Sequence, residues 1–251
     1  TGHQLKQLEK EMRIAEEIGM KRLRWLDGEA ARELVGSPTY LAARFDKHCG
    51  LLQPAKLARG LADAAERLGA AVYERTRVTD VDAEKMQVAT DRGTVRARSI
   101  VIAANAYSSG IRQLKNKQLP IYTYIALTEP LPEDKLAEIG WRRNIGIEDA
   151  RNYLHYYRLT PDRRLLFGGS DALYYYGAPL DRDRNEDIFR NLQETVRRTF
   201  PALKDVKFTH HWGGPISATL DLVPMIGRLR ENVWYSVGCM GHGVALASYN
   251  G

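Results

Sequence analysis

The residues whose types and spacing best suit a binding site lie near the end of the chain, where three glycines occur within six residues. Gly238, Gly241 and Gly243 follow a short apolar segment, residues 233–237, which predicts a buried strand, and residues 244–249 predict the start of a helix. The first N–H groups of a helix have no partner within it and carry partial positive charge, and glycines let a ligand approach that backbone closely. The segment is therefore either a binding site for an electron-rich group or a tight turn that binds nothing.

Composition and charge restrict the class of protein. The chain has 251 residues, of which 44% are apolar and 27% charged, as in ordinary globular proteins. The net charge is +6, but the basic residues are scattered among 31 acidic ones, so we predict a solvated surface and no nucleic-acid partner. No apolar run is long enough to span a bilayer, so no membrane contact is expected. Two cysteines, Cys49 and Cys239, cannot form a disulfide framework, which favours a reducing cytoplasm.

Hydrophobic periodicity predicts helices followed by strands in the first half of the chain. The expected helices lie at residues 4–18, between Asp27 and Gly36, and at 54–68, and the expected strands lie at 71–73, 78–81, 86–89, 94–97 and 99–104. Residues 99–104 are continuously apolar, which is typical of a strand covered on both faces.

The middle of the chain predicts a second region that is rich in strands. Its expected elements are a strand at residues 120–127, a short helix from 132, a hairpin of 153–159 with 165–169, a long helix at 182–200 and a strand at 206–212. The chain then returns through two adjacent glycines, Gly213 and Gly214, toward the glycine-rich turn.

The order of these segments resembles the flavin-dependent amine and amino-acid oxidase family, which includes glycine oxidase, sarcosine oxidase and D-amino-acid oxidase. The likeness is greatest to gamma-glutamylputrescine oxidoreductase-like members. It rests on residues 50–54, Val78, 101–105, 153–169, 219–227 and 238–243. Each motif is weak alone, and their order and spacing together make the resemblance specific.

The resemblance implies an α+β fold in two parts. One is the remnant of a Rossmann-like FAD-binding domain, residues 1–112 and 210–251, and the other is a substrate domain of antiparallel sheet with helices, residues 113–209. The family begins with a strand–GxGxxG–helix unit that holds the FAD pyrophosphate, and residues 1–251 contain no such motif. We therefore expect a piece of a longer protein, which binds FAD when intact and only weakly or not at all as this chain alone.

The resemblance also implies which residues face the cofactor: Val78, Ala104, Asn105, Gly214, Gly241, His242, Gly243 and Val244. In the family, the segment that matches Gly241 to Val244 faces the pyrimidine edge of the flavin. A reduced flavin is negatively charged at that edge, and a helix N-terminus stabilises such a charge. His242 either adds charge of its own or is a turn histidine bonded to backbone.

The substrate side departs from the amino-acid oxidases of the family at one position. These place an arginine two residues after the glycine that matches Gly214, and this chain has Ile216 there. An aliphatic side chain cannot form a bidentate bond with a carboxylate. We therefore expect a putrescine-like amine as substrate, oxidised at its C–N bond to an imine and then an aldehyde. Tyr156 falls where a family tyrosine orients substrate, or it is simply an inward-facing aromatic of the hairpin.

Several possibilities stay open at the level of sequence. No catalytic acid or base can be assigned, and no metal site is expected, because His210 and His211 would point to opposite faces of a strand. The chain could be a non-catalytic subunit that lends a substrate domain to a partner, and an oligomer is possible. It could also be an amino-acid oxidase whose carboxylate anchor has moved to Arg158 or Arg44.

Overall fold

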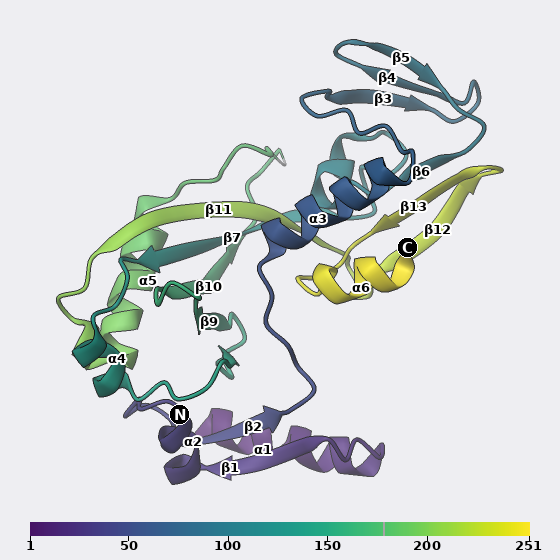
Figure 1. Ribbon diagram of the computed structural model, residues 1–251. Helices are drawn as coiled ribbons and strands as arrows, with labels where there is room; N and C mark the ends of the chain where they lie inside the picture. Colours follow the sequence, from purple (N-terminus) through teal and green to yellow (C-terminus); the bar gives the residue numbers. More distant parts are fainter. Residues whose placement is uncertain (178) are drawn as a thin grey trace. The chain divides into compact units, whose positions relative to one another are not determined.

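The computed structural model describes residues 1–177 and 179–251, which form an α+β fold (Figure 1). The helices are α1 Gly2–Glu17, α2 Gly28–Leu34, α3 Pro54–Arg67, α4 Glu133–Ile139, α5 Glu186–Thr199 and α6 Gly243–Asn250, with 3-10 turns η1 Asn105–Gly110 and η2 Pro201–Leu203. The strands are β1 Leu23–Asp27, β2 Ala42–Asp46, β3 Val78–Asp82, β4 Gln87–Thr90, β5 Gly93–Arg96, β6 Ile100–Ile102, β7 Leu119–Thr128, β8 Gly146–Glu148, β9 His155–Leu159, β10 Leu165–Leu173, β11 Phe208–Ala218, β12 Met225–Arg230 and β13 Val233–Val237.

The strands form four sheets, with orders β1-β2, β11-β7-β10-β9-β8, β12-β13-β6 and β3-β4-β5. The chain divides into two compact units. The first unit comprises Thr1–Leu51, Thr123–Ala172 and Asp183–Gly213, and the second unit comprises Leu52–Tyr122, Leu173–Arg182 and Gly214–Gly251.

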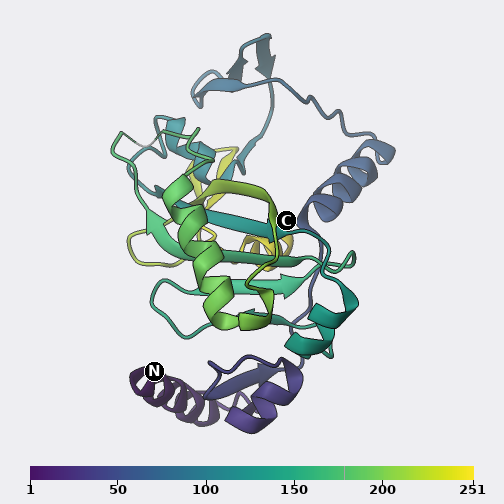
Figure 2. The ribbon, with the colours of Figure 1, turned by 90° about the vertical axis from the view of Figure 1, so that its left-hand side faces the viewer.

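The first unit is built on the large sheet, one face of which is covered by α5 (Figure 2). Every second residue of β7 is buried, as expected when one face of a sheet is covered. Tyr124 on β7 meets Phe189 on α5 edge to face, with ring centroids 5.7 Å apart. The helix begins later than residue 182, because the Asn185 side chain caps it by accepting a hydrogen bond from the Ile188 N–H at 3.2 Å.

The N-terminal segment, Thr1–Leu51, belongs to this first unit. Gly36 N–H donates to the Ile139 carbonyl at 2.7 Å, and the hydroxyls of Tyr40 and Tyr157 are 2.9 Å apart. The antiparallel pair of β1 and β2, which the sequence did not predict, lies in the same segment, with α2 between the two strands in the chain. The compact units thus do not follow the expected domain boundaries here, and the assignment of residues 1–51 to a cofactor-binding domain stays a prediction.

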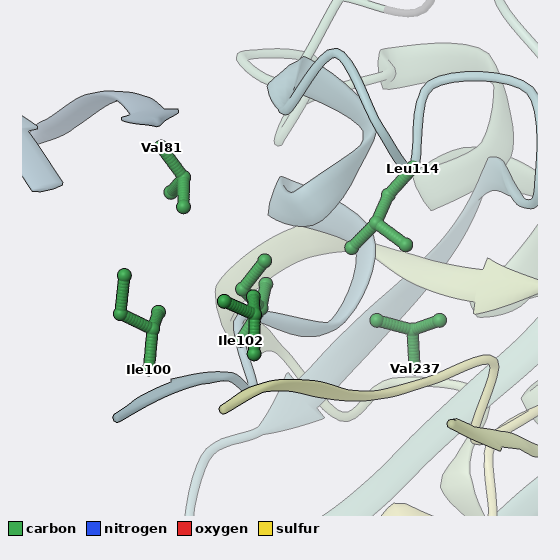
Figure 3. Close-up of a cluster of buried hydrophobic side chains, with 6 residues drawn as sticks. Val81, Ile100, Ile102, Leu114 and Val237 are labelled. Atoms are coloured by element: carbon green, nitrogen blue, oxygen red, sulfur yellow. The ribbon is translucent and has the colours of Figure 1, made fainter. Parts of the chain in front are cut away.

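The second unit is built on β12-β13-β6, in which β13 pairs antiparallel with β12 and parallel with β6. One face of this sheet packs into an apolar cluster with β3 and the segment after η1. The buried members are Val81, Ile100, Ile102, Leu114, Val233 and Val237, five of which are labelled in Figure 3. The glycine-rich turn described below follows β13 and is therefore anchored to this core.

One expected strand does not form, and another is packed on one face only. Within residues 99–104, Ile100 and Ile102 are buried, while Val101 is 68% exposed. Alternation of side chains along a strand places Val101 on the opposite face, where no described element lies against it. Residues 71–73 form no strand, because the paired segment begins only at Val78.

Three glycines in strands lie beneath the ring of a tyrosine on another strand. They are Gly168 beneath Tyr156, Gly213 beneath Tyr124 and Gly227 beneath Tyr235; a Cβ at any of these glycines would lie less than 3.0 Å from the ring or its hydroxyl. These positions therefore hold glycine because the ring occupies the space of a side chain, whatever their backbone angles.

Candidate functional site

The glycine-rich turn, residues 238–242, connects β13 to α6 in the second unit (Figure 1). Gly238 and Gly241 have φ of +76° and +83°, which L-residues rarely adopt. A Cβ at Gly241 would meet no atom of the chain within 4 Å, so the backbone there is open to a ligand. His242 precedes α6 without capping it, and its Nδ1 lies 3.1 Å from the Met240 carbonyl oxygen. That contact matches the interpretation of His242 as a turn histidine bonded to backbone.

The structure brings Asn105 to this turn. Because β6 and β13 are parallel, the segments that follow them leave the same edge of the sheet. Ala104 precedes η1, which begins at Asn105, and the Cys239 thiol donates a hydrogen bond to Asn105 Oδ1 at 3.3 Å. Two predicted cofactor segments, distant in sequence, therefore meet in one place.

The end of β11 contacts the same turn. The Met240 N–H donates to the Ser217 carbonyl at 3.1 Å, one residue after the half-buried Ile216. Gly214, two residues before Ile216, has open space where a Cβ would point. Its neighbour Gly213 faces the opposite way, onto Tyr124.

No hydrogen bond among the described residues joins Val78 to the turn. It is the first residue of β3 and is 47% exposed. Only its strand neighbour Val81 reaches the apolar cluster that supports β13. Its role beside an adenine therefore stays a prediction.

Tyr156 lies in the first unit on β9, on the face of the sheet opposite His155 and Tyr157. Its ring covers Gly168. Burial raises the pKa of the Tyr156 hydroxyl, and a hydrogen bond with Thr123 opposes that rise only in part, so the phenol keeps its proton at neutral pH. Its position relative to Ile216, which lies in the second unit, stays a prediction.

Sequence reasoning missed a buried carboxylate–imidazole pair. His155 is 2% exposed, and its Nδ1 lies 2.8 Å from Asp149 Oδ2. Burial acts to raise the pKa of Asp149, but hydrogen bonds from the His155 ring and backbone outweigh it and hold that pKa below its usual range. The pair faces Phe167 on the buried side of the sheet, so we interpret it as structural. Its six-residue spacing across a loop matches no pattern that would have revealed it.

The residues around the turn suit an FAD group by their own geometry. Gly241 offers backbone that a planar ring can approach, and α6 presents its first N–H groups beside it. Val244, at 45% exposure, adds apolar surface in the first turn of α6. Among the described residues, no group of three or more His, Cys, Asp and Glu side chains is placed to hold a metal ion.

The second unit thus holds a parallel pair of strands, one of which leads through a glycine turn into a helix, and the first unit holds a large sheet with one helix-covered face. The whole chain, residues 1–251, matches the family described as FAD dependent oxidoreductase, and the chain belongs to this family.

Individual members of the family and their solved structures can also be compared with this chain. The chain is similar to gamma-glutamylputrescine oxidoreductase of Escherichia coli strain K12, with 38% identity over 96% of this chain and 55% of that protein. It is also similar to the probable oxidoreductase OrdL of Haemophilus influenzae, with 30% identity over 97% and 56%. The crystal structure of glycine oxidase from Geobacillus kaustophilus superposes with a TM-score of 0.83 at 21% identity, covering 99% of this chain and 66% of that one, and this likeness shows the fold.

The chain spans about half the length of the curated relatives it matches. None of the described helices is both long and apolar enough to cross a bilayer.

Proposed function

We propose that the whole protein uses FAD to oxidise the C–N bond of a small amine that lacks an α-carboxylate near the reacting carbon. The observation that carries this proposal is Ile216, which stands near the glycine turn where the resemblance expects an arginine. A carboxylate facing Ile216 without a partner would cost several kcal/mol, the order of an unpaired buried charge. The 38% identity to a gamma-glutamylputrescine oxidoreductase supports an amine of the putrescine type.

Bound FAD would supply the two-electron oxidation by accepting hydride from the carbon that bears the nitrogen, and the resulting imine would hydrolyse to an aldehyde. The residues of this chain would bind and orient. The N–H groups at the start of α6 would stabilise negative charge on the flavin, and the open backbone at Gly241 would let the flavin ring approach closely. Tyr156 keeps its proton and can donate or accept one hydrogen bond to substrate.

The test is substrate preference in the FAD-bound protein. We expect kcat/KM to be higher for putrescine-type amines than for glycine or sarcosine. Ile216→Arg should lower kcat/KM for amines and raise it for amino acids, because a guanidinium then faces the substrate. The control Ile226→Arg, on β12, adds the same charge where the side chain is 63% exposed. It should change kcat/KM neither for amines nor for amino acids. Faster turnover of the amino acids by the unmodified protein would refute the proposal.

A second candidate, an amino-acid oxidase with a relocated anchor, is favoured by the position of Arg158. Strand alternation places Arg158 on the same face of the sheet as Tyr156, and no salt bridge joins it to another described residue. Arg44 is less suited, because its guanidinium is paired with Glu11 at 2.8 Å. If this candidate is right, Arg158→Leu should raise KM for amino acids while Arg44→Leu leaves it unchanged.

A further inference from the structure

A chain of buried hydrogen bonds joins the two segments that meet at the candidate site. Ser217 is 0% exposed and Gln118 is 3% exposed. Ser217 Oγ accepts from the Gly238 N–H at 2.8 Å and donates to Gln118 Oε1. Gln118 Nε2 donates to the Asn105 carbonyl at 3.2 Å. The link therefore runs without a gap from Asn105 to the first residue of the glycine turn.

Further contacts fix the turn from the β11 side. The Met240 N–H donates to the Ser217 carbonyl at 3.1 Å, and the Thr219 N–H lies 3.4 Å from Met240 Sδ. With the hydroxyl of Ser217, this makes three contacts between residues 217–219 and residues 238–240. The end of β11 thus determines where the turn lies.

Two residues that these hydrogen bonds hold have strained backbone. Asn105 has φ of +46° and Met240 has φ of +51°, both in the left-handed region without being glycine. Such residues persist only where the surroundings over-determine their conformation, and they cluster at ligand clamps and active sites. Here the carbonyl of Asn105 is held by Gln118 and its side chain by Cys239.

We propose that Ser217 and Gln118 are positioning residues for the flavin: they hold Asn105 and residues 238–243 in one fixed arrangement, so that the two segments that face the cofactor move together or not at all. The proposal rests on the proposed function only in assigning FAD to this turn. Neither residue carries a sequence pattern that marks it, because a serine at a strand end and a glutamine before a strand are ordinary polar residues.

The first test measures amide hydrogen exchange in the chain without FAD, using Ser217→Ala and Gln118→Leu. Removing either side chain leaves buried groups of the network unpaired, which favours local opening. We expect Ser217→Ala to speed exchange in residues 238–243 about tenfold, and Gln118→Leu to speed it in both 238–243 and 105–110. The control is Ser37→Ala, another serine at 0% exposure, whose Oγ donates to the Thr199 carbonyl at 2.5 Å in the first unit. It should lower the melting temperature without affecting either segment.

The second test uses the whole protein and measures the FAD dissociation constant and the two-electron reduction potential of the flavin. Both should shift in Ser217→Ala and Gln118→Leu, with the dissociation constant rising about tenfold, and neither should shift in Ser37→Ala. Unchanged exchange in residues 238–243, or equal loosening in Ser37→Ala, would overturn the proposal. Faster exchange with unaltered affinity and potential would also overturn it, because the network would then be structural only. Failure of the unmodified whole protein to bind FAD would be seen before any variant is made and would refute the proposed function as well.

Discussion

Gly241→Val separates the folding role of the glycine turn from its role toward the cofactor. Gly241 has φ of +83°, and nothing lies within 4 Å of the position of an added Cβ. The valine therefore meets backbone strain but no clash within the chain. Any further effect must come from a group that approaches the turn from outside.

The chain contains a matched control at Gly19, which has φ of +77° and the same open surroundings but lies after α1 in the first unit. A left-handed L-residue costs about 1–2 kcal/mol at either site. For a chain of this size that corresponds to a fall in melting temperature of roughly 2–8 °C in both variants. Only Gly241→Val should also block a hydrogen bond to the flavin, at about 1.5–3 kcal/mol, which weakens FAD binding about 10- to 150-fold.

The measurements, made on the whole protein, are the melting temperature and the FAD dissociation constant, the latter from quenching of flavin fluorescence. The expected result is a similar thermal shift in both variants and a loss of affinity in Gly241→Val alone. Equal FAD affinity in Gly241→Val and Gly19→Val would return the turn to a purely structural role and would falsify the reasoning.

Two further predictions concern the large sheet. Gly213→Ala should destabilise the protein by about 1–3 kcal/mol in a denaturant titration, because its Cβ collides with the Tyr124 ring, whereas Gly214→Ala, with open space, should leave stability unchanged. Asp149→Asn should lower the free energy of unfolding at neutral pH by about 1–3 kcal/mol, because it weakens the bonds to His155. Since the pKa of Asp149 is lower in the folded protein, its contribution is present above about pH 4 and is lost as the pH falls below that, so the acid-side slope of stability against pH should be shallower in the variant; identical slopes would contradict this.

Most elements could be predicted from local signals. Asp27 caps α2 and Gln53 caps α3 where the sequence indicated, and the strand–turn–helix at the C-terminus begins and ends within a residue of expectation. The pairing of β1 with β2 could not be predicted, because the alternation in each strand is short and interrupted by charged residues.

Only the part of the candidate site that is formed by backbone groups could be predicted from the sequence. Three glycines in six residues mark the turn, and the parallel pairing of β6 with β13 then brings Asn105 beside it. The supporting side chains, Ser217 and Gln118, are separated by almost a hundred residues, and their bond depends on tertiary packing that no local pattern records. The same holds for Asp149 and His155, which meet only because of the path of one loop.

The three tyrosine-over-glycine pairs have a consequence for how this sequence can change. In each pair the tyrosine ring fills the space that a side chain at the glycine would need. The pairs are Gly168 with Tyr156, Gly213 with Tyr124 and Gly227 with Tyr235. A side chain gained at the glycine is blocked while the ring remains, and a ring lost from the tyrosine exposes a weak stretch of strand. The two positions of each pair should therefore change together. We expect homologous chains that lack the ring at one position to carry a larger residue at the other. For Tyr156 this coupling joins a residue expected to face substrate to a glycine of the neighbouring strand, so we expect a smaller residue at position 156 to be accompanied by a larger one at position 168.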